Sequence, residues 1–517
     1  MIYCLSLLLA LVIVIASCKT LKTIYKTPKT TYTNALPVDV SMILSLNVKS
    51  ILKKAELSEG KNTDLKQKAT NLLKGKMSPA SFAVIEKVIQ KPEESGIDIA
   101  APFYIAFTEI TTGNNTPVIL AKVNNLNKLK SFWNVMASEK ISTPIEQRGN
   151  YNYGTFAGNS VICAFNESVL LFGANNLEET DKLMSQKKAE SGALNSAFVK
   201  LQEKKGEIKY YLDLKPFAKI NFPGMPLNED HKEKFDMESF FCISFEKGKV
   251  CMQIDVVTEN ANLKQLFEKG TKFTGKQKSV FTGKIPASVF AYLGFNINGE
   301  EYYNYLKDLL ATYPTIFSVL TPYLESGKEL FSWIKGDVAV ALLDVSSKVP
   351  VVCAYAEVAD ASLLKKTVDN LQKNNLIGDS VEIIELKEND YVYQKGKTKL
   401  HIGVIDKYLY VTNSEDAYQT IIEGTPPSGK TLKDTKFASK IKGTPQYTFI
   451  SVDNILQSPL GLGVGTKTSK LLSRISYLEI VSSKKHTYGG ELNLIMKDEK
   501  TNALAQIMAL IRELAGI

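Results

Sequence analysis

The sequence predicts an α+β fold made of two tandem homologous domains, each with a mostly antiparallel sheet and packed helices. The chain has 517 residues, which is more than one hydrophobic core normally organises, so at least two domains are expected. Strand-like segments are clustered and joined by short turns, and helical stretches lie between the clusters rather than after every strand. This arrangement favours antiparallel sheets over a doubly wound parallel fold.

An internal repeat supports the division into two domains. Residues 36–48 align without a gap with residues 285–297, and residues 151–176 align with residues 391–416, 240 positions later. Few residues are identical, but the order, the spacing and the alternation of apolar side chains agree. Because a slip of one residue would turn every side chain of a strand to the opposite face, this agreement predicts the same strands in both copies. The period is too long for a solenoid and indicates two copies of one domain.

Each copy is expected to contain the same series of elements. Pro79 at a first helical position after Ser78, and Asn176 or Ser414 ahead of acidic residues, are typical helix starts. In chain order the elements are a strand (42–48 or 289–297), a helical stretch, two strands (103–108 with 118–123, or 338–343 with 351–358), an amphipathic helix (126–136 or 363–371), a meander around Tyr-x-Tyr, a capped helix, a hairpin (240–257 or 476–496) and a closing helix.

The N-terminus is typical of a lipoprotein export signal. Leu5–Ile15 is an apolar run too short to span a bilayer comfortably as a helix, and Ala16 and Ser17 place small side chains directly before Cys18. We therefore expect residues 1–17 to be a signal peptide. Ile-Ala-Ser-Cys resembles the bacterial lipobox, which implies that Cys18 carries the lipid attachment, although the first residues lack the usual basic charge. The alternative is an apolar anchor that is never cleaved.

The remaining domain boundaries follow from composition. Residues 19–34 contain four lysines and no acidic residue, so they cannot bury enough apolar surface to fold, and residues 18–34 are expected to be a lipidated cysteine with a polar basic tether. The first repeat is expected over 35–270 and the second over 285–517. Between them, residues 271–284 contain Phe-Thr-Gly-Lys twice among other lysines, and we expect a linker there.

A short motif at the start of the first repeat points to a family. Leu36-Pro37-x-Asp39-x-Ser41, followed by an apolar strand that ends in Asn-Val-Lys-Ser-Ile-Leu at residues 47–52, resembles uncharacterised lipoproteins of Bacteroides-type bacteria that share a domain of unknown function. The resemblance covers about residues 35–517. It implies a compartment, the cell envelope, but it brings no activity and no functional residue.

Two features that suggest nucleic acid or nucleotide binding have simpler explanations. The net charge of +9 comes from scattered lysines with few arginines, whereas phosphate recognition usually recruits the arginine fork, so we expect no nucleic-acid partner. Gly424–Thr431 matches the phosphate-binding P-loop pattern. However, it follows an expected helix instead of a strand, and a polar stretch without a helical stripe comes after it. We therefore predict a Pro-Gly turn there and no nucleotide.

The sequence shows no catalytic, cofactor or metal site. The three histidines, His231, His401 and His486, have no spacing typical of metal ligands, and Cys-x-x-Cys is absent. The acidic run around His231 could bind a divalent cation weakly, but a solvated loop is the favoured interpretation. No nucleophile elbow, Ser-x-x-Lys or paired-carboxylate signature stands out, so hydrolase chemistry is unsupported by the sequence but not excluded. Cys18 is thus the one site residue that we predict.

The other cysteines of the mature chain lie in apolar, strand-like runs. Cys163, Cys242, Cys251 and Cys353 are expected to be buried thiols. One alternative stays open at this point, because Cys242 and Cys251 flank a turn and could form a disulfide if the hairpin register places them opposite each other.

These observations lead to an expected function. We expect a membrane-tethered cell-envelope lipoprotein with a non-enzymatic binding or structural role, because a lipid anchor precedes a duplicated body without a catalytic constellation. Its partners would be the membrane, through the anchor, and an envelope protein or polymer. Lys19-Thr20 lacks the aspartate that retains lipoproteins in the inner membrane, and the tether lacks an acidic export cluster, so we expect the outer membrane facing the periplasm. The alternative is an envelope hydrolase with an unrecognised active site in one repeat.

Overall fold

The structure is a computed structural model of the chain. It describes residues 31–57, 62, 64–108, 117–156, 161–174, 176–219, 235–311, 328–329, 331–345, 349–360, 362–373, 381–396, 398–425, 427, 429–463, 465–482 and 488–515.

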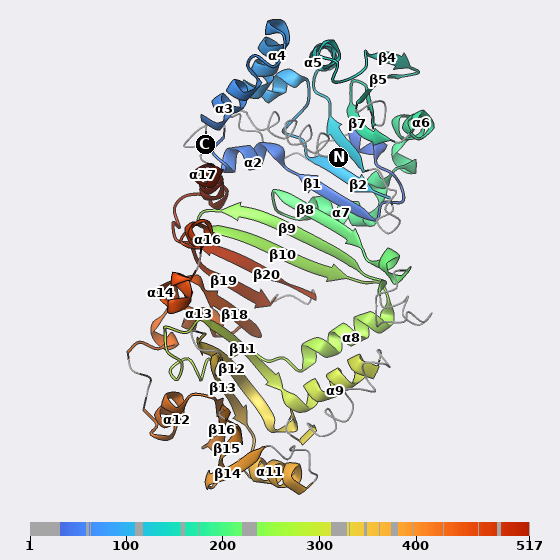
Figure 1. Cartoon of the computed structure of the whole chain (residues 1–517). Helices are drawn as coiled ribbons and strands as arrows, with labels where there is room; N and C mark the ends of the chain where they lie inside the picture. The colour runs from blue at the N-terminus through green and yellow to red at the C-terminus, as the bar shows by residue number, and fades with distance from the viewer. Residues whose placement is uncertain are drawn as a thin grey trace. The chain divides into compact units, whose positions relative to one another are not determined.

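The described residues form two compact units of mixed helix and sheet (Figure 1). The first unit consists of Met1–Val257 together with Asp498–Ile517, and the second consists of Thr258–Lys497. Every strand pairing within the two units is antiparallel, so the predicted α+β class with antiparallel sheet is confirmed.

The first unit contains ten strands in one antiparallel order, β4-β5-β6-β7-β3-β2-β1-β8-β9-β10. The first strand of the chain therefore lies in the interior of the order. The bounds are β1 (Met42–Leu46), β2 (Phe103–Phe107), β3 (Val118–Lys122), β4 (Glu146–Arg148), β5 (Tyr151–Phe156), β6 (Val161–Phe165), β7 (Val169–Ala174), β8 (Ile208–Asp213), β9 (Glu238–Glu246) and β10 (Lys249–Val257).

The helices of the first unit begin at the capping residues that the sequence predicts. The side chain of Ser78 accepts a hydrogen bond from the backbone N–H of Ser81, and that of Asn176 accepts one from Glu179. The bounds are η1 (Thr31–Ala35), α2 (Val48–Lys54), α3 (Asp64–Leu73), α4 (Pro79–Gln90), η2 (Pro92–Ser95), α5 (Leu126–Ser138), α6 (Leu177–Ser185), η3 (Lys188–Glu190), η4 (Gly192–Leu194), α7 (Ser196–Glu203), η5 (Lys215–Lys219) and α17 (Ala503–Ala515).

The second unit repeats this strand order. Its ten strands lie in the order β14-β15-β16-β17-β13-β12-β11-β18-β19-β20, which is the first order with ten added to every strand number. The bounds are β11 (Ala291–Asn298), β12 (Ile334–Asp344), β13 (Val351–Val358), β14 (Glu382–Lys387), β15 (Asp390–Lys395), β16 (Thr398–Ile405), β17 (Tyr408–Thr412), β18 (Gln446–Ser451), β19 (Ile475–Ser482) and β20 (Tyr488–Met496).

The second unit also begins a helix at a capping residue that the sequence predicts. Ser414 caps α12 as predicted, since its side chain accepts a hydrogen bond from the backbone N–H of Ala417. The bounds are α8 (Ala261–Lys272), α9 (Gly299–Ala311), α11 (Leu363–Lys373), α12 (Glu415–Ile422), η7 (Leu432–Asp434), α13 (Phe437–Ile441), α14 (Val452–Gln457), α15 (Pro459–Leu462) and α16 (Thr466–Leu472).

One face of each sheet packs under helices and forms the main core of its unit. In the first unit Ile43 of β1 and Phe240 of β9 pack in one buried cluster with Phe198 of α7. In the second unit Tyr292 of β11 and Phe449 of β18 pack in a corresponding cluster with Ile441 of α13. We call this the covered face of each sheet. It is lined by alternate residues of the strands, as burial of one face requires.

The opposite face is packed over β3 and β7, or β13 and β17, and this packing extends to Phe103 of β2 in the first unit and to Ile297 of β11 and Val338 of β12 in the second. There, Trp133 of α5 packs with Phe165 and Leu170 in the first unit. In the second unit, Leu364 of α11 packs in a cluster with Tyr391.

The helix that follows the last strand of each sheet does not belong to the same unit as that sheet. α8 follows the last strand of the first sheet but belongs to the second unit, where Lys269 forms an ion pair of 2.7 Å with Asp308 of α9. α17 follows the last strand of the second sheet but belongs to the first unit, where it packs on α2, β9 and β10. The expected repeats 35–270 and 285–517 therefore differ from the compact units at both ends.

Specific contacts hold α17 in the first unit. The side-chain amide of Asn502 donates a hydrogen bond of 3.0 Å to the carbonyl of Phe245, and Arg512 donates one of 2.9 Å to Asp64. Gly248, at the turn between β9 and β10, has a φ of +62° and lies so close to Glu499 that a Cβ would be 2.5 Å from its Cα. This turn therefore requires glycine both for its backbone angle and for the close approach.

Two segments predicted to lie outside the domains are part of them. Residues 271–284 were expected to be a linker, but Phe281 is 2% exposed and packs in the core of the second unit. The expected tether over 18–34 is also too long at its C-terminal end, because Tyr32 is 2% exposed and stacks near Tyr104. In both segments one aromatic side chain provides the apolar contact that the polar composition conceals.

Candidate functional site

An apolar, half-exposed sheet face is the most extensive surface feature of the first unit. Two rows of side chains cross five neighbouring strands, β2, β1, β8, β9 and β10, since residues paired directly across antiparallel strands share a face. The rows are Ile105, Leu44, Tyr210, Phe241 and Ile254, and next to them Phe107, Met42, Leu212, Ser239 and Val256. We call these ten residues the open face of the first unit.

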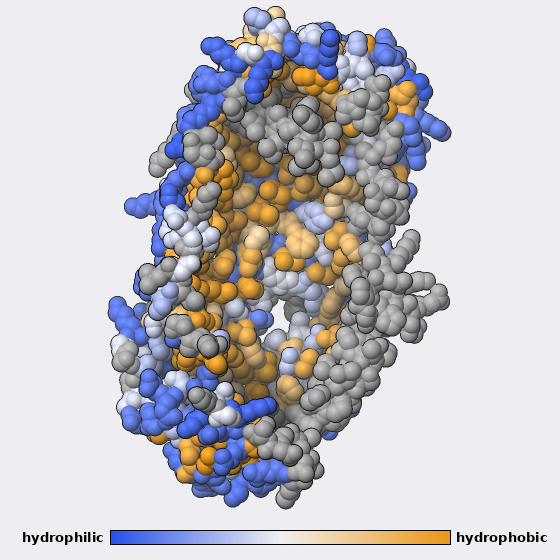
Figure 2. Space-filling view, in the orientation of Figure 1, coloured by the Kyte–Doolittle hydropathy of each residue, from blue (hydrophilic) through white to orange (hydrophobic). Residues whose placement is uncertain are grey.

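The second unit has the same feature on the corresponding strands, β12, β11, β18, β19 and β20. Its rows are Val340, Leu293, Thr448, Ile480 and Leu492, and next to them Leu342, Ala291, Ile450, Leu478 and Leu494. These ten residues are the open face of the second unit. Figure 2 shows hydrophobic residues gathered over the sheet strands, with hydrophilic residues at the periphery.

The open faces are apolar without being buried. Ile254, Val340, Ile450 and Ile480 are 36%, 37%, 41% and 45% exposed, whereas Ile43, which alternates with open-face residues along β1, is 0% exposed. None of the twenty positions carries a charged side chain. Alternate residues of one strand thus have a similar apolar character, and only one set packs under helices.

The open faces also offer few hydrogen-bonding groups. Tyr210, Ser239 and Thr448 are the polar residues among the twenty. The Tyr210 hydroxyl lies 2.8 Å from the sulfur of Met42, and Ser239 is 5% exposed. The backbone groups of the four interior strands of each set are directed to sheet partners, because each of these strands has a neighbour on both sides in the order. A molecule lying on an open face would therefore meet hydrocarbon and aromatic surface.

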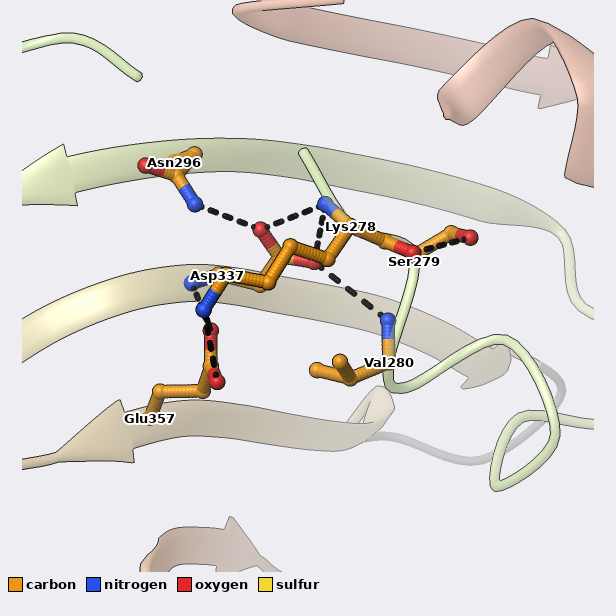
Figure 3. Close-up of polar contacts among 6 residues, drawn as sticks. All are labelled: Lys278, Ser279, Val280, Asn296, Asp337 and Glu357. Atoms are coloured by element: carbon orange, nitrogen blue, oxygen red, sulfur yellow. Dashed lines mark hydrogen bonds and ion pairs between the residues drawn. The ribbon is translucent and has the colours of Figure 1, made fainter. Parts of the chain in front are cut away.

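A buried carboxylate at Asp337 has a structural role (Figure 3). Asp337 of β12 is 2% exposed and accepts hydrogen bonds from the backbone N–H groups of Lys278 and Val280 and from the side-chain amide of Asn296. Glu357 of β13 in turn accepts from the Asp337 backbone N–H at 2.7 Å and from the Lys278 ammonium at 3.2 Å. These bonds fix residues 278–280 against the sheet, and the Asp337 carboxylate has three donors around it.

A second buried cluster contains the one histidine that the structure describes. Asp390 is 2% exposed and accepts hydrogen bonds from the hydroxyls of Tyr410 at 2.6 Å and Tyr418 at 2.7 Å. Burial, together with the bond to Asp390, raises the pKa of the Tyr410 phenol above its ordinary value. Gly403 leaves room for this contact, because a Cβ there would be 2.2 Å from the Tyr410 hydroxyl oxygen.

His401 lies beside this cluster. It is 4% exposed, stacks on Tyr418 at 4.1 Å between ring centroids, and has Nε2 3.2 Å from the Glu415 carboxylate. Its Nδ1 has no hydrogen-bond partner among the described residues. The carboxylate of Asp390 already accepts two phenol hydroxyls, and neither phenol is ionised at neutral pH. We therefore interpret this cluster as a packed polar core rather than as a general-base site.

The covered face of each unit contains an ion pair between a lysine and a buried carboxylate, although the two carboxylates lie on strands that do not correspond. Lys204, directly after α7, lies 2.5 Å from Asp255 of β10, which is 4% exposed. Lys440 of α13 lies 2.6 Å from Glu479 of β19, which is 5% exposed. In both units a lysine from the covering helix neutralises a buried carboxylate of the last two strands. Removal of either lysine would leave an uncompensated buried charge.

The structure describes some of the residues that the sequence analysis named, and others lie outside the described ranges. Cys18, His231 and His486 lie outside the described residues. None of the four described cysteines is in a disulfide, and burial raises the pKa of the Cys353 thiol to about 11. The register of the hairpin pairs Cys242 with Gln253 and Cys251 with Ser244, so the two cysteines are offset by two positions and are not opposite each other.

The P-loop-like segment has the local structure of a turn. It follows α12, and the described residues after it form η7, a three-residue 3₁₀ helix. Gly424 and Gly429 have φ values of +65° and +85°, which glycine adopts readily in turns. Thr431 and Asp434 then form a capping box, so the threonine that would bind a metal–phosphate group in a P-loop is used as a helix cap.

The part of the chain that the structure describes contains neither a membrane-spanning helix nor a cluster of metal-ligating side chains. No helix there is both long enough and apolar enough to cross a membrane. No three His, Cys, Asp or Glu side chains in these ranges form a group that could hold a metal ion.

Comparison with known proteins gives a family and a distant structural similarity. Two crystal structures, forms IV and III of TP0453, match 44% and 47% of this chain and 81% and 87% of their own chains. Their identity to this chain is 11% and 12%, and the TM-score is 0.26 for both, so they carry no argument here. No curated protein matches the chain significantly. The family model of a domain of unknown function, DUF4836, matches residues 32–504, and the chain therefore belongs to this family.

Proposed function

We propose that this chain is a cell-envelope lipoprotein with a non-enzymatic binding role, held on a membrane through acyl chains on Cys18. The observation that carries the binding role is the pair of open faces, which lie on corresponding strands of the two units. A sheet face of this character is normally packed against another layer, and an exposed apolar patch of this kind is typical of a binding surface.

The proposed anchor rests on the N-terminal sequence. The apolar run of Leu5–Ile15 precedes Ile-Ala-Ser-Cys, which resembles a lipobox, and about a dozen residues rich in lysine and threonine separate Cys18 from the first described element, η1. A lipid-modified cysteine with two or more acyl chains is a stable membrane anchor. We further propose the outer membrane, facing the periplasm, because Lys19 follows the cysteine where an inner-membrane lipoprotein usually has aspartate.

We also propose that the two units are homologous domains that arose by duplication. The same order of ten strands and the occurrence of Leu44 and Leu293 at equivalent row positions support this proposal. Unrelated sheets of ten strands have many possible orders, so an identical order combined with an aligned sequence is difficult to obtain by chance.

The anchor is tested by Cys18→Ala in the native host, with Cys4→Ala as the matched control, because Cys4 would be removed with the signal peptide. We expect Cys18→Ala to abolish incorporation of labelled fatty acid and to release the chain from the membrane fraction, whereas Cys4→Ala stays membrane-bound. A Cys18→Ala chain that still sediments with membranes at unchanged mobility would disprove the anchor. Digestion of the mature protein by protease added to intact cells would contradict the periplasmic location.

A further inference from the structure

We propose that each open face binds the acyl chains of a phospholipid. This inference deepens the proposed binding function and rests on it, because it names the ligand class that the open faces take. The bound group is hydrocarbon that lies across five strands, with the headgroup in solvent beside the sheet.

The composition of the faces selects for hydrocarbon. Seventeen of the twenty positions are apolar side chains, and the Tyr210 hydroxyl is already directed to the sulfur of Met42. The sheet hydrogen bonds occupy the backbone groups beneath. A peptide or a polysaccharide placed there would lose hydrogen bonds to water and gain none, which is costly for every buried polar group. An acyl chain has no such groups to lose, and its burial is favourable in proportion to the area removed from water.

The size of the faces argues against a protein partner, including a second copy of this chain. With about 4.8 Å between strands and about 6.7 Å between alternate residues, ten positions cover on the order of 300 Å². A stable protein–protein interface buries about 800 Å² on each partner, more than twice this area. An extended acyl chain needs only a narrow strip, and each row provides an uninterrupted strip across five strands.

The two open faces are expected to differ in how strongly they bind lipid. The first unit places aromatic rings at Phe107, Tyr210 and Phe241, and Tyr210 and Phe241 pack edge-to-face against each other at 5.7 Å between centroids. The second unit has only aliphatic side chains and Thr448 at its ten positions, and three of the four most exposed open-face residues belong to it. More apolar area thus remains to be buried on the second face, so it should bind the larger share of lipid.

The test uses the mature chain carrying Cys18→Ala, so that the anchor contributes nothing to lipid binding. The chain is incubated with vesicles of phosphatidylethanolamine and phosphatidylglycerol, separated from them by gel filtration, and its phospholipid is counted by mass spectrometry. Ile480→Glu and Ile254→Glu place a carboxylate on the second and first open faces. Ile384→Glu is the matched control, since Ile384 is also a strand residue of the second unit, is 37% exposed and lies outside the rows.

We expect phospholipid to co-elute with the parent chain and with Ile384→Glu. Ile480→Glu should lose more lipid than Ile254→Glu, and the double variant should lose at least roughly ten-fold, because an acyl chain would have to desolvate the new charge. All three positions are already exposed, so the substitutions leave the core intact, which circular dichroism will verify.

Three results would overturn the inference. The first is a parent chain that elutes without lipid. The second is equal lipid binding by the double variant, or an equal loss in Ile384→Glu. The third is a dimer of the parent chain, seen by light scattering, that becomes a monomer in the double variant, since a second copy would then occupy the faces. Each of these leaves the anchor untouched, because membrane fractionation of Cys18→Ala tests it separately.

Discussion

Replacement of Leu510 by alanine tests the assignment of the C-terminal helix to the first unit. Leu510 of α17 is 3% exposed, whereas the next residue of the same helix, Ile511, is 50% exposed. A buried Leu→Ala change removes the transfer free energy of the side chain and leaves a cavity, which together cost about 2–5 kcal/mol of the free energy of unfolding. We expect about 3 kcal/mol for Leu510→Ala, and a change within about 0.5 kcal/mol for the control Ile511→Ala.

The decisive measurement is which strands lose stability in Leu510→Ala. Native-state hydrogen exchange, read by mass spectrometry, should show amide exchange about 100-fold faster in β9 and β10, since about 1.4 kcal/mol corresponds to a factor of ten. Peptides from β19 and β20 should keep their rates, although they precede α17 directly in the sequence. Faster exchange in β19 and β20 with unchanged exchange in β9 and β10 would refute the assignment of residues 498–517 to the first unit.

Three further predictions concern polar and thiol groups. Hydrogen bonds from Arg148 and a tyrosine lower the pKa of Asp181 to about 2 from an ordinary value of 3.8. The Arg148–Asp181 pair therefore stabilises the fold above about pH 4 and loses its effect as the pH falls to 2. In Arg148→Ala, an NMR titration should show the Asp181 pKa moving up towards 3.8. In Asp337→Ala three donors lose their acceptor, and urea unfolding should show a loss of about 3 kcal/mol; a loss below about 0.5 kcal/mol would contradict the role of this carboxylate. At pH 8 the thiol of Cys353, with a pKa of about 11, should resist alkylation until the chain is unfolded, whereas the half-exposed Cys251 reacts first; rapid native alkylation of Cys353 would contradict its burial.

Most individual elements could be predicted from the sequence because their signals are local. Ser78, Asn176 and Ser414 each cap a helix through a side-chain oxygen, as their positions ahead of helical stretches predicted. The hairpins over 240–257 and 476–496 were also anticipated from alternation and turn residues, and they correspond to β9–β10 and β19–β20. Such signals depend on neighbours within a few positions, so one sequence is sufficient to detect them.

The open faces could not be predicted, because alternation shows the apolar sides of a strand but not what covers them. Leu293 and Tyr292 are adjacent apolar residues of β11, yet Tyr292 is 2% exposed under helices and Leu293 is half-exposed. A strand with apolar residues on both sides is therefore predicted to be buried on both faces. Which apolar side of a strand is covered depends on where helices dock, and docking is a property of the folded units.

In the segments 18–34 and 271–284, composition predicts exposed chain where the structure has buried residues. Both are dominated by lysine and threonine, so their mean composition predicts exposed chain. Tyr32 and Phe281 nevertheless lie in the cores of their units. Burial of one aromatic side chain contributes on the order of 2 kcal/mol, which is enough to order the few residues around it but too little to alter an average over fourteen or more residues.

Because α8 belongs to the second unit and α17 to the first, fragments cut at the expected repeat boundaries should be less stable than the compact units. A fragment over 35–270 keeps the first sheet but loses α17, whose docking includes a hydrogen bond of 3.2 Å from the fully buried Asn62 to the carbonyl of Ala505. Without α17 that amide and the apolar surface beneath Leu510 are exposed to water. A fragment over 285–517 loses α8 and the buried Phe281, and it carries α17 without the unit that binds it. We therefore expect the units that unfold cooperatively to be the compact units rather than the expected repeats 35–270 and 285–517. A fragment that joins residues 498–517 to the end of β10 should be more stable than one that ends at residue 270.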